Sequence, residues 1–136
     1  MMVLARILAG GPAEGAVLVL DEPLSFWGGF DPRTGLILDV HHPQAGQCIS
    51  GTVTLMSESR GSGSAPGAIA EAVRLGTAPA AVILAVPDVN LAVGVEVAAT
   101  LYGRNCTIAC VSADDLARLH ALSRVRITAD GVLTPV

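Results

Sequence analysis

The sequence predicts a single α/β domain in which a β-rich N-terminal half packs on a parallel βαβαβ half. The chain has 136 residues, a length that suits one core rather than two. Its first half is a series of short Val-, Ile- and Leu-rich runs separated by Gly and Pro. Its second half alternates apolar runs of strand length with runs that are apolar at helical spacing. We therefore expect one domain over residues 1–136.

Short strands joined by loops are expected throughout the first half. Each candidate strand is rich in Val, Ile or Leu, and the gaps contain Gly or Pro, which favour turns. The predicted strands are 3–10, 16–22, 36–40 and 51–57, with a turn at 10–15 and loops at 25–35 and 41–47.

The second half is expected to alternate helices with buried strands. A helix is predicted from Pro66 to Leu75 because Pro is tolerated in a first turn and Gly76 is placed to end the helix. Ser112 and Asp115 resemble a capping box at the start of a later helix. The other predicted elements are strands at 80–86, 106–112, 125–130 and 131–136 and helices at 91–103 and 113–122. Strands joined through helices form right-handed crossovers, so a parallel sheet is expected here.

The composition indicates a protein partner and argues against nucleic acid and membrane. Hydrophobic residues make up 51% and charged residues 15%, so we expect another chain to cover part of the apolar surface. The net charge of -4, without a Lys/Arg cluster, provides no footprint for nucleic acid. No apolar run approaches the ~20 residues that span a bilayer, and residues 1–9 do not resemble a signal peptide. We expect a cytoplasmic protein.

The cysteines Cys48, Cys106 and Cys110 form no CxxC motif. Their odd number argues against a disulfide scaffold and agrees with a reducing compartment. Cys106 and Cys110 lie on one face of a predicted strand, and free thiols commonly fill cores. We expect no metal site on this chain.

The segment SRGSGSAPG at residues 59–67 has two interpretations. It can be a helix-capping turn, because Ser64 suits an N-cap and glycine supplies backbone freedom. It can equally be an anion site formed by the N–H groups of the helix start with the hydroxyls of Ser62 and Ser64. The phosphate-loop patterns GxxxxGKS/T and GxGxxG are not met, so a nucleotide is not indicated. A hydrolase is the least favoured activity, because GxSxG and a histidine at motif distance are missing.

Two further loops carry polar side chains. Asp31 and Arg33 lie in the loop 25–35, and His41 and His42 lie in the next loop. Taken singly, these are typical turn and surface residues. Ligands of parallel α/β sheets bind where loops leave the carboxyl ends of strands, so we expect the three loops to meet at one edge.

The order of these segments resembles the small subunit, or swivel domain, of the aconitase X family. The similarity lies in LARILAGGPAEGAVLVLDEPLSFWGGFDPRTG, then HHPQAGQCISGTVTL, SRGSGS and AIAEAVRLGTAPAAVIL, which cover nearly the whole chain. The resemblance implies a swivelling β/β/α domain similar to the mobile fourth domain of aconitase. It also implies a separate small subunit that acts with a large catalytic subunit.

The family resemblance implies a dehydratase that removes water from a hydroxy acid. An iron centre, either an iron-sulfur cluster or a single iron, is then expected on the large subunit and not on this chain. The family motif matches RGSGS, which makes Ser62 the expected general base. The expected substrate-binding residues are Arg60, Gly61, Gly63 and Ser64, together with Asp31, Arg33 and His42, which contact either the substrate or the large subunit.

The same loop distinguishes two substrates within the family. Archaeal members, which act on phosphomevalonate, tend to have a Lys and a Ser-Thr-Val run here, whereas RGSGSAPGAIAEAVRLG is similar to the bacterial form. The expected reaction is therefore the dehydration of cis-3-hydroxy-L-proline to pyrroline-2-carboxylate, with phosphomevalonate as the alternative substrate. From another functional class, a non-catalytic anion-binding or docking module remains the rival hypothesis.

Overall fold

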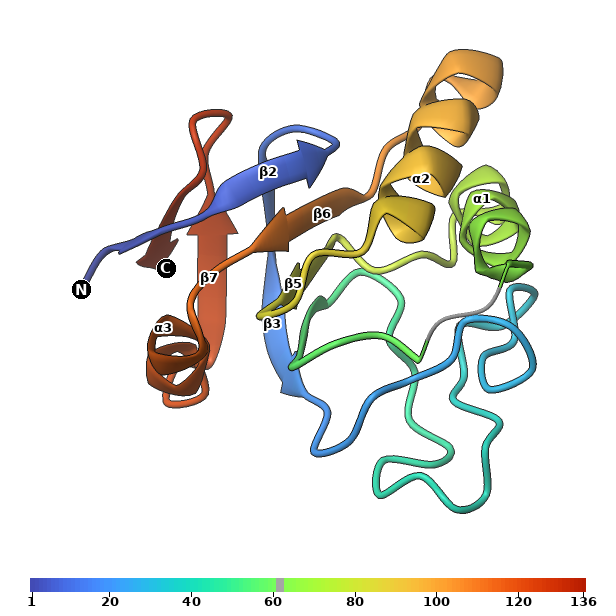
Figure 1. The fold of residues 1–136 in the computed structure, drawn as a ribbon, viewed down its shortest axis with the longest axis horizontal. Coiled ribbons are helices and arrows are strands. Elements are labelled where there is room, and N and C mark those ends of the chain that lie inside the picture. Colours follow the sequence, from blue (N-terminus) through green and yellow to red (C-terminus); the bar gives the residue numbers. More distant parts are fainter. Residues whose placement is uncertain (61–62) are drawn as a thin grey trace.

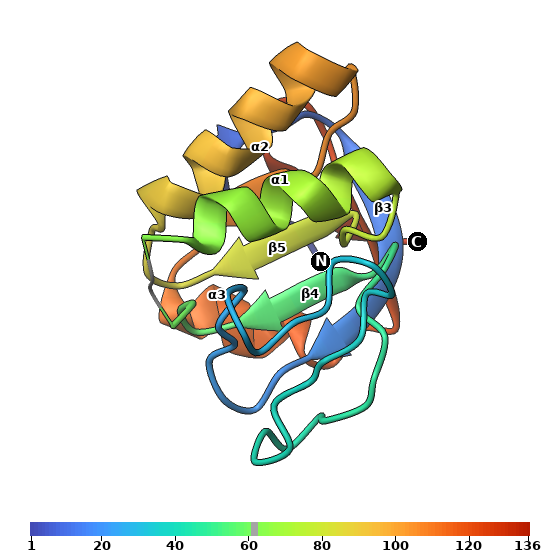
Figure 2. The ribbon, with the colours of Figure 1, turned by 90° about the vertical axis from the view of Figure 1, so that its right-hand side faces the viewer.

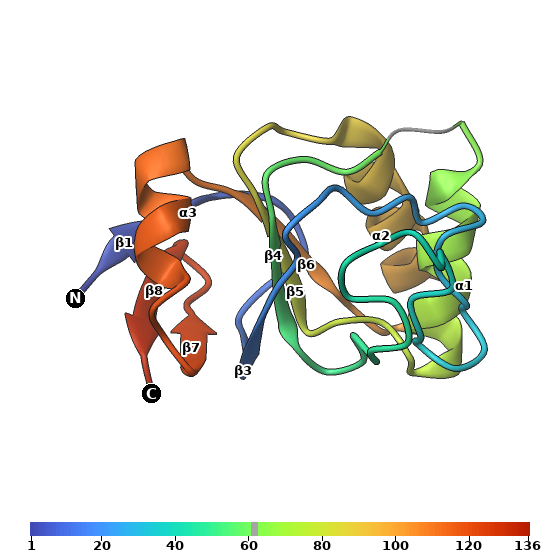
Figure 3. The ribbon, with the colours of Figure 1, turned by 90° about the horizontal axis from the view of Figure 1, so that it is seen from below.

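The structure, a computed structural model that describes residues 1–60 and 63–136, has three layers (Figures 1 and 3). The central layer contains β3 (Ala13–Val19), β4 (Val53–Met56), β5 (Ala81–Leu84) and β6 (Thr107–Cys110), with β2 (Arg6–Ala9) at its edge. One face is covered by α1 (Ala65–Leu75) and α2 (Val89–Tyr102). The other is covered by β1 (Val3–Leu4), β7 (Arg124–Ile127), β8 (Val132–Pro135) and α3 (Ala113–Leu119). This β/β/α layering confirms the predicted fold class.

The central strands β3 to β6 run parallel, and β4–α1–β5–α2–β6 is the βαβαβ unit expected from the sequence (Figure 2). Every residue of β4 and β5 is buried, because layers cover both faces of these strands. Leu55 and Ile83 face the second β layer, whereas Met56 and Leu84 face the helices. The domain thus has two apolar cores, one on each side of the central layer.

The N-terminal segment contributes the strands at both ends of the sheet. The strand order is β1-β8-β7-β3-β4-β5-β6-β2, so β1 and β2 lie at opposite ends although only Ala5 separates them in sequence. The Ala5 N–H donates to the Gly131 carbonyl at 2.8 Å. The predicted strand 3–10 therefore divides into two. The predicted turn 10–15 is too long, because β3 already begins at Ala13 and pairs with β7.

The predicted strand 36–40 is wrong. This segment forms only isolated bridges, Phe30 with Ile37 and Leu36 with Cys48. Its backbone groups bond within the loop instead: the Leu38 N–H donates to Gly29 at 2.9 Å. The N-terminal half therefore packs on the helical side largely through irregular chain, while C-terminal strands build most of the second β layer.

The helices begin and end close to the predicted residues. Gly76 at φ 79° and Gly103 at φ 64° terminate α1 and α2 in the left-handed region that glycine adopts without strain. The Ser112 hydroxyl accepts from the Asp115 N–H at 3.1 Å, which confirms the predicted cap of α3. Among the described residues no helix is both long and apolar enough to cross a membrane.

The two helices on the sheet pack closely because α2 contains a glycine at the crossing. A methyl group on Gly94 would lie 2.5 Å from the Pro66 carbonyl oxygen and 2.6 Å from Ile69 Cγ2. Pro66 belongs to the first turn of α1. The close contact at Gly94 therefore helps to fix the position of the first turn of α1.

Candidate functional site

The described residues that flank the predicted base, 57–60 and 63–64, lie at the carboxyl edge of the parallel strands, between the end of β4 and the start of α1 (Figure 2). Helices α1 and α2 both follow parallel strands, so both N-termini lie at this edge, where their dipoles favour negative charge. Two residues of the predicted site, Gly61 and the proposed base Ser62, lie outside the described residues.

The chain that enters this segment is held on two sides. On one side, the N–H groups of Ala85 and Val86 donate to the Ser57 carbonyl at 2.9 and 3.0 Å. On the other side, the Arg60 N–H donates to the Leu24 carbonyl at 3.0 Å. Residues 57–60 thus run between the loop after β5 and the segment after β3.

The chain that leaves the segment begins α1. Ser64 occupies the N-cap position, and its carbonyl accepts from the Ala68 N–H at 3.3 Å. Its side chain makes no capping bond to the part of the helix that the structure describes. The structure therefore confirms Ser64 as the N-cap position but not as a residue whose side chain caps the helix. Arg60, Gly63 and Ser64 are exposed. A methyl group on Gly63 would meet no described atom within 4 Å.

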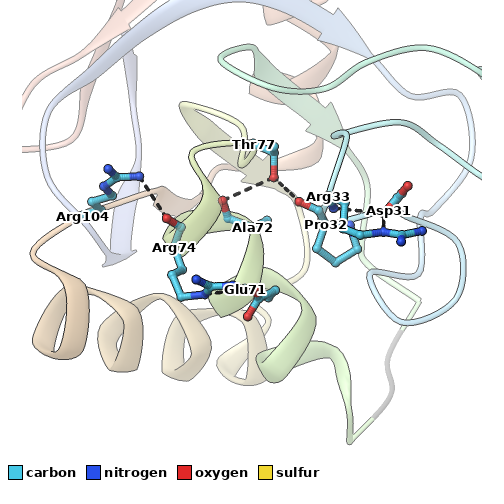
Figure 4. A network of polar contacts seen from close by, with 8 residues as sticks. All are labelled: Asp31, Pro32, Arg33, Glu71, Ala72, Arg74, Thr77 and Arg104. Atoms are coloured by element: carbon cyan, nitrogen blue, oxygen red, sulfur yellow. Dashed lines mark hydrogen bonds and ion pairs between the residues drawn. The ribbon is translucent and has the colours of Figure 1, made fainter.

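Asp31 and Arg33 form a local turn (Figure 4). The Asp31 carboxylate accepts from the Arg33 N–H at 2.9 Å and lies 3.5 Å from the Arg33 guanidinium. The backbone hydrogen bond from Arg33 is the largest cause that lowers the pKa of Asp31. Arg33 itself extends into solvent, with 85% of its side chain exposed.

The Asp31 turn is attached toward the C-terminal end of α1. The Thr77 hydroxyl donates to the Pro32 carbonyl, and Thr77 follows the glycine that ends α1 (Figure 4). The 11 residues of α1 span about 16 Å at the usual helical rise. Asp31 and Arg33 are therefore held toward the other end of the helix from the Gly/Ser segment, and the three loops do not all converge on one point.

His42 is buried and fixes a loop. Its Nε2 lies 2.9 Å from the Glu22 carbonyl, and its Nδ1 accepts from the Gln44 N–H at 3.0 Å. Both ring nitrogens are therefore occupied by backbone groups. The neighbouring His41 is exposed. His42 thus anchors the loop 41–47 to the segment that follows β3, close in sequence to Leu24.

A mostly apolar hollow of about 440 Å³ runs along the side of α1. It is lined by Phe26, Trp27, Gly28, Phe30 and Pro32 of the first loop and by Gly67, Ala68 and Glu71 of α1. Trp27 is 61% exposed, whereas Phe26 and Phe30 are buried. The charge at its edge is neutralised, because Arg74 bonds to Glu71 (Figure 4).

The part of this chain that the structure describes offers no set of iron ligands. No group of three or more His, Cys, Asp or Glu side chains comes together there. Burial raises the pKa of the Cys106 thiol to about 12, which disfavours the thiolate that binds metal. An iron centre does not fit these residues, so we derive no step through iron on this chain.

Asp88 is a polar residue of this edge that was not predicted. One carboxylate oxygen accepts from the Leu91 N–H at 3.1 Å and caps α2, while the other accepts from the Ser59 hydroxyl. An acidic residue directly before an apolar helical run is a typical N-cap signal, and the sequence carries it. The bond to Ser59 depends on the pairing of β4 with β5 and has no local signal.

Comparison with known proteins agrees with this architecture. The family model described as "Aconitase X swivel domain" matches residues 2–134. A chain of the crystal structure of Thermococcus kodakaraensis aconitase X in its holo form superimposes with a TM-score of 0.81 at 28% identity, over 100% of this chain and 98% of that chain.

The similar curated proteins are dehydratases, which are hydro-lyases. A cis-3-hydroxy-L-proline dehydratase of Pseudomonas aeruginosa is 40% identical over 110 residues, which are 81% of this chain but 19% of that protein. A phosphomevalonate dehydratase small subunit of Thermococcus onnurineus is 34% identical over 136 residues, covering 100% of this chain and 98% of that subunit. The chain thus spans about a fifth of the former and nearly all of the latter. It belongs to the aconitase X swivel domain family.

Proposed function

We propose that the chain is the small subunit of an aconitase X-type dehydratase and that it supplies Ser62 as the general base. Its partner is a large catalytic subunit, which we assign the iron centre expected from the family. The observation that carries the proposal is that the described residues 57–60 follow the parallel strand β4, and the described residues 63–64 directly precede α1, at the carboxyl edge of a family-matched sheet. The 34% identity to the Thermococcus onnurineus small subunit supports the role of a small subunit.

The reaction removes a proton and a hydroxide from neighbouring carbons and leaves a carbon–carbon double bond. In this proposal Ser62 accepts the proton from the carbon next to the carboxylate. A neutral hydroxyl is a poor base, so the negative charge on its oxygen must be stabilised. The N–H groups of Gly63 and Ser64 and the N-terminus of α1 supply that stabilisation, and Arg60 adds positive charge.

The other predicted residues receive supporting roles. Gly61 and Gly63 lack side chains and so let the backbone approach Ser62 and the substrate closely. The open space next to Gly63 supports this role, because no described residue would contact a side chain there. Asp31 and Arg33 contact the large subunit rather than the reacting carbons, and His42 holds its loop.

The substrate we propose is cis-3-hydroxy-L-proline. Loss of water across C2 and C3 gives an enamine, and transfer of the ring N–H proton to C3 then gives the cyclic imine pyrroline-2-carboxylate. The 40% identity to the Pseudomonas aeruginosa enzyme supports it. Phosphomevalonate is the second candidate, because an archaeal phosphomevalonate dehydratase small subunit is 34% identical to this chain over 136 residues.

The proposal is tested by producing this chain together with an aconitase X large subunit from the same genome. The purified complex, loaded with iron, is assayed with both substrates in parallel, and each subunit alone serves as the control. We expect the complex to convert one substrate and the separate subunits to convert neither. A stable complex that converts neither substrate would support a docking module instead.

A further inference from the structure

We infer that Asp88 is a positioning residue, which through Ser59 fixes the chain at the entrance to the loop that carries the proposed base. This inference rests on the proposed function. The role of Asp88 is not to contact the substrate but to act on the chain that leads to the proposed base. It adds to the site a side chain from the loop between β5 and α2.

The Asp88 carboxylate bonds in two directions. One oxygen accepts from the Leu91 N–H at 3.1 Å at the start of α2, and the other accepts from the Ser59 hydroxyl. Both Asp88 and Ser59 are partly buried. Since an ionised carboxylate can only accept, the Ser59 hydroxyl is the donor and the bond is charge-assisted.

This bond is one of several that fix the entrance to the segment. The Ser57 carbonyl accepts from the N–H groups of Ala85 and Val86, and the Arg60 N–H donates to Leu24. These backbone contacts locate residues 57 and 60, and among the described residues Asp88 supplies the side-chain contact that holds Ser59. The Ser59 side chain is therefore oriented by Asp88. Asp88 is in turn held by its hydrogen bond to the first turn of α2.

Small displacements at such a position are costly for catalysis. A shift of about 1 Å in a reacting group can lower a rate roughly a hundredfold, even when binding is little affected. We therefore expect the loss of the Ser59–Asp88 bond to lower kcat at least about tenfold with little change in KM. A merely structural bond would lower thermal stability and leave kcat unchanged.

The test compares variants of the complete two-subunit complex. Ser59→Ala removes the bond and leaves the cap of α2, whereas Asp88→Ser keeps a capping residue that is too short to reach Ser59. Asp88→Asn keeps both the cap and a polar partner for Ser59, so it should restore most of the kcat. Ser112→Ala is the control, because it removes a helix cap on α3, away from this edge.

The measured quantities are kcat, KM and the melting temperature of each complex. We expect Ser59→Ala and Asp88→Ser to lose kcat to a similar extent, while Ser112→Ala melts earlier but keeps its kcat. The inference fails if Ser59→Ala retains the wild-type kcat in a complex whose activity requires Ser62. If the wild-type complex is inactive, or if Ser62→Ala is fully active, it is the proposed function that fails.

Discussion

Replacing Gly94 with alanine should destabilise the domain even though alanine is the better helix former. The added methyl would lie 2.5 Å from the Pro66 carbonyl oxygen, 2.9 Å from Pro66 Cα and 2.6 Å from Ile69 Cγ2. Favourable contacts between carbon atoms occur at about 3.5–4.0 Å, so the overlap is on the order of 1 Å. The backbone of Pro66 cannot rotate away, so the two helices must move apart.

The balance of two effects sets the magnitude. Alanine gains about 1 kcal/mol over glycine inside a helix. Overpacking a close interface costs about 1–3 kcal/mol, and contact with a backbone favours the upper part of that range. We therefore expect Gly94→Ala to lower the free energy of unfolding by about 1–2 kcal/mol.

A matched control is available in the adjacent helix. A methyl group on Gly67 of α1 would meet no described atom within 4 Å, so Gly67→Ala should gain up to about 1 kcal/mol. Urea unfolding of the purified variants, followed by circular dichroism, measures both. The reasoning is refuted if Gly94→Ala is as stable as the wild type or gains stability as Gly67→Ala does.

Two further predictions concern ionisable groups. Hydrogen bonds from Arg126 and Arg124 lower the pKa of Glu14 below its usual value of about 4.3. Glu14 therefore stabilises the fold at neutral pH, and this contribution is lost as the pH falls through the pKa of the folded state. Urea unfolding of Glu14→Gln should therefore show a deficit at pH 7 that shrinks in acid; a deficit of equal size at both pH values would contradict this. Burial raises the pKa of Cys106 to about 12, so a thiol reagent should modify exposed Cys48 in the native chain and Cys106 only after unfolding. Because Cys110 is partly exposed, the double variant Cys48→Ser/Cys110→Ser should remove the fast reaction, and rapid labelling of Cys106 in that variant would show that the core opens.

The elements that the sequence predicted well are those with strong local signals. The strands around Leu55 and Ile83 are short apolar runs between turn residues, and α1 and α2 end at glycines that the sequence marks. The predicted strand at 36–40 has the same apolar composition, but its backbone groups bond to Gly29 and other loop residues. Composition alone cannot reveal that competition.

Long-range pairing accounts for the other differences. The N-terminal strand divides at Ala5 because its two parts pair with β8 and β6, which are distant in sequence. Likewise, the sequence suggested that Asp31 and Arg33 share a site with the Gly/Ser segment, whereas the Thr77 hydroxyl holds their loop toward the C-terminal end of α1. The contact of Asp88 with Ser59 also joins two loops that only the folded sheet brings together.

The most direct test of the central claim is the turnover number of the two-subunit complex carrying Ser62→Ala, with gel filtration to verify that the subunits still associate. A general base contributes at least about a hundredfold to the rate, so we predict a loss of that size or larger. A hydroxyl that only binds substrate contributes about 1 kcal/mol, which is roughly fivefold. An intact complex that loses no more than this would contradict the assignment of Ser62 as the base.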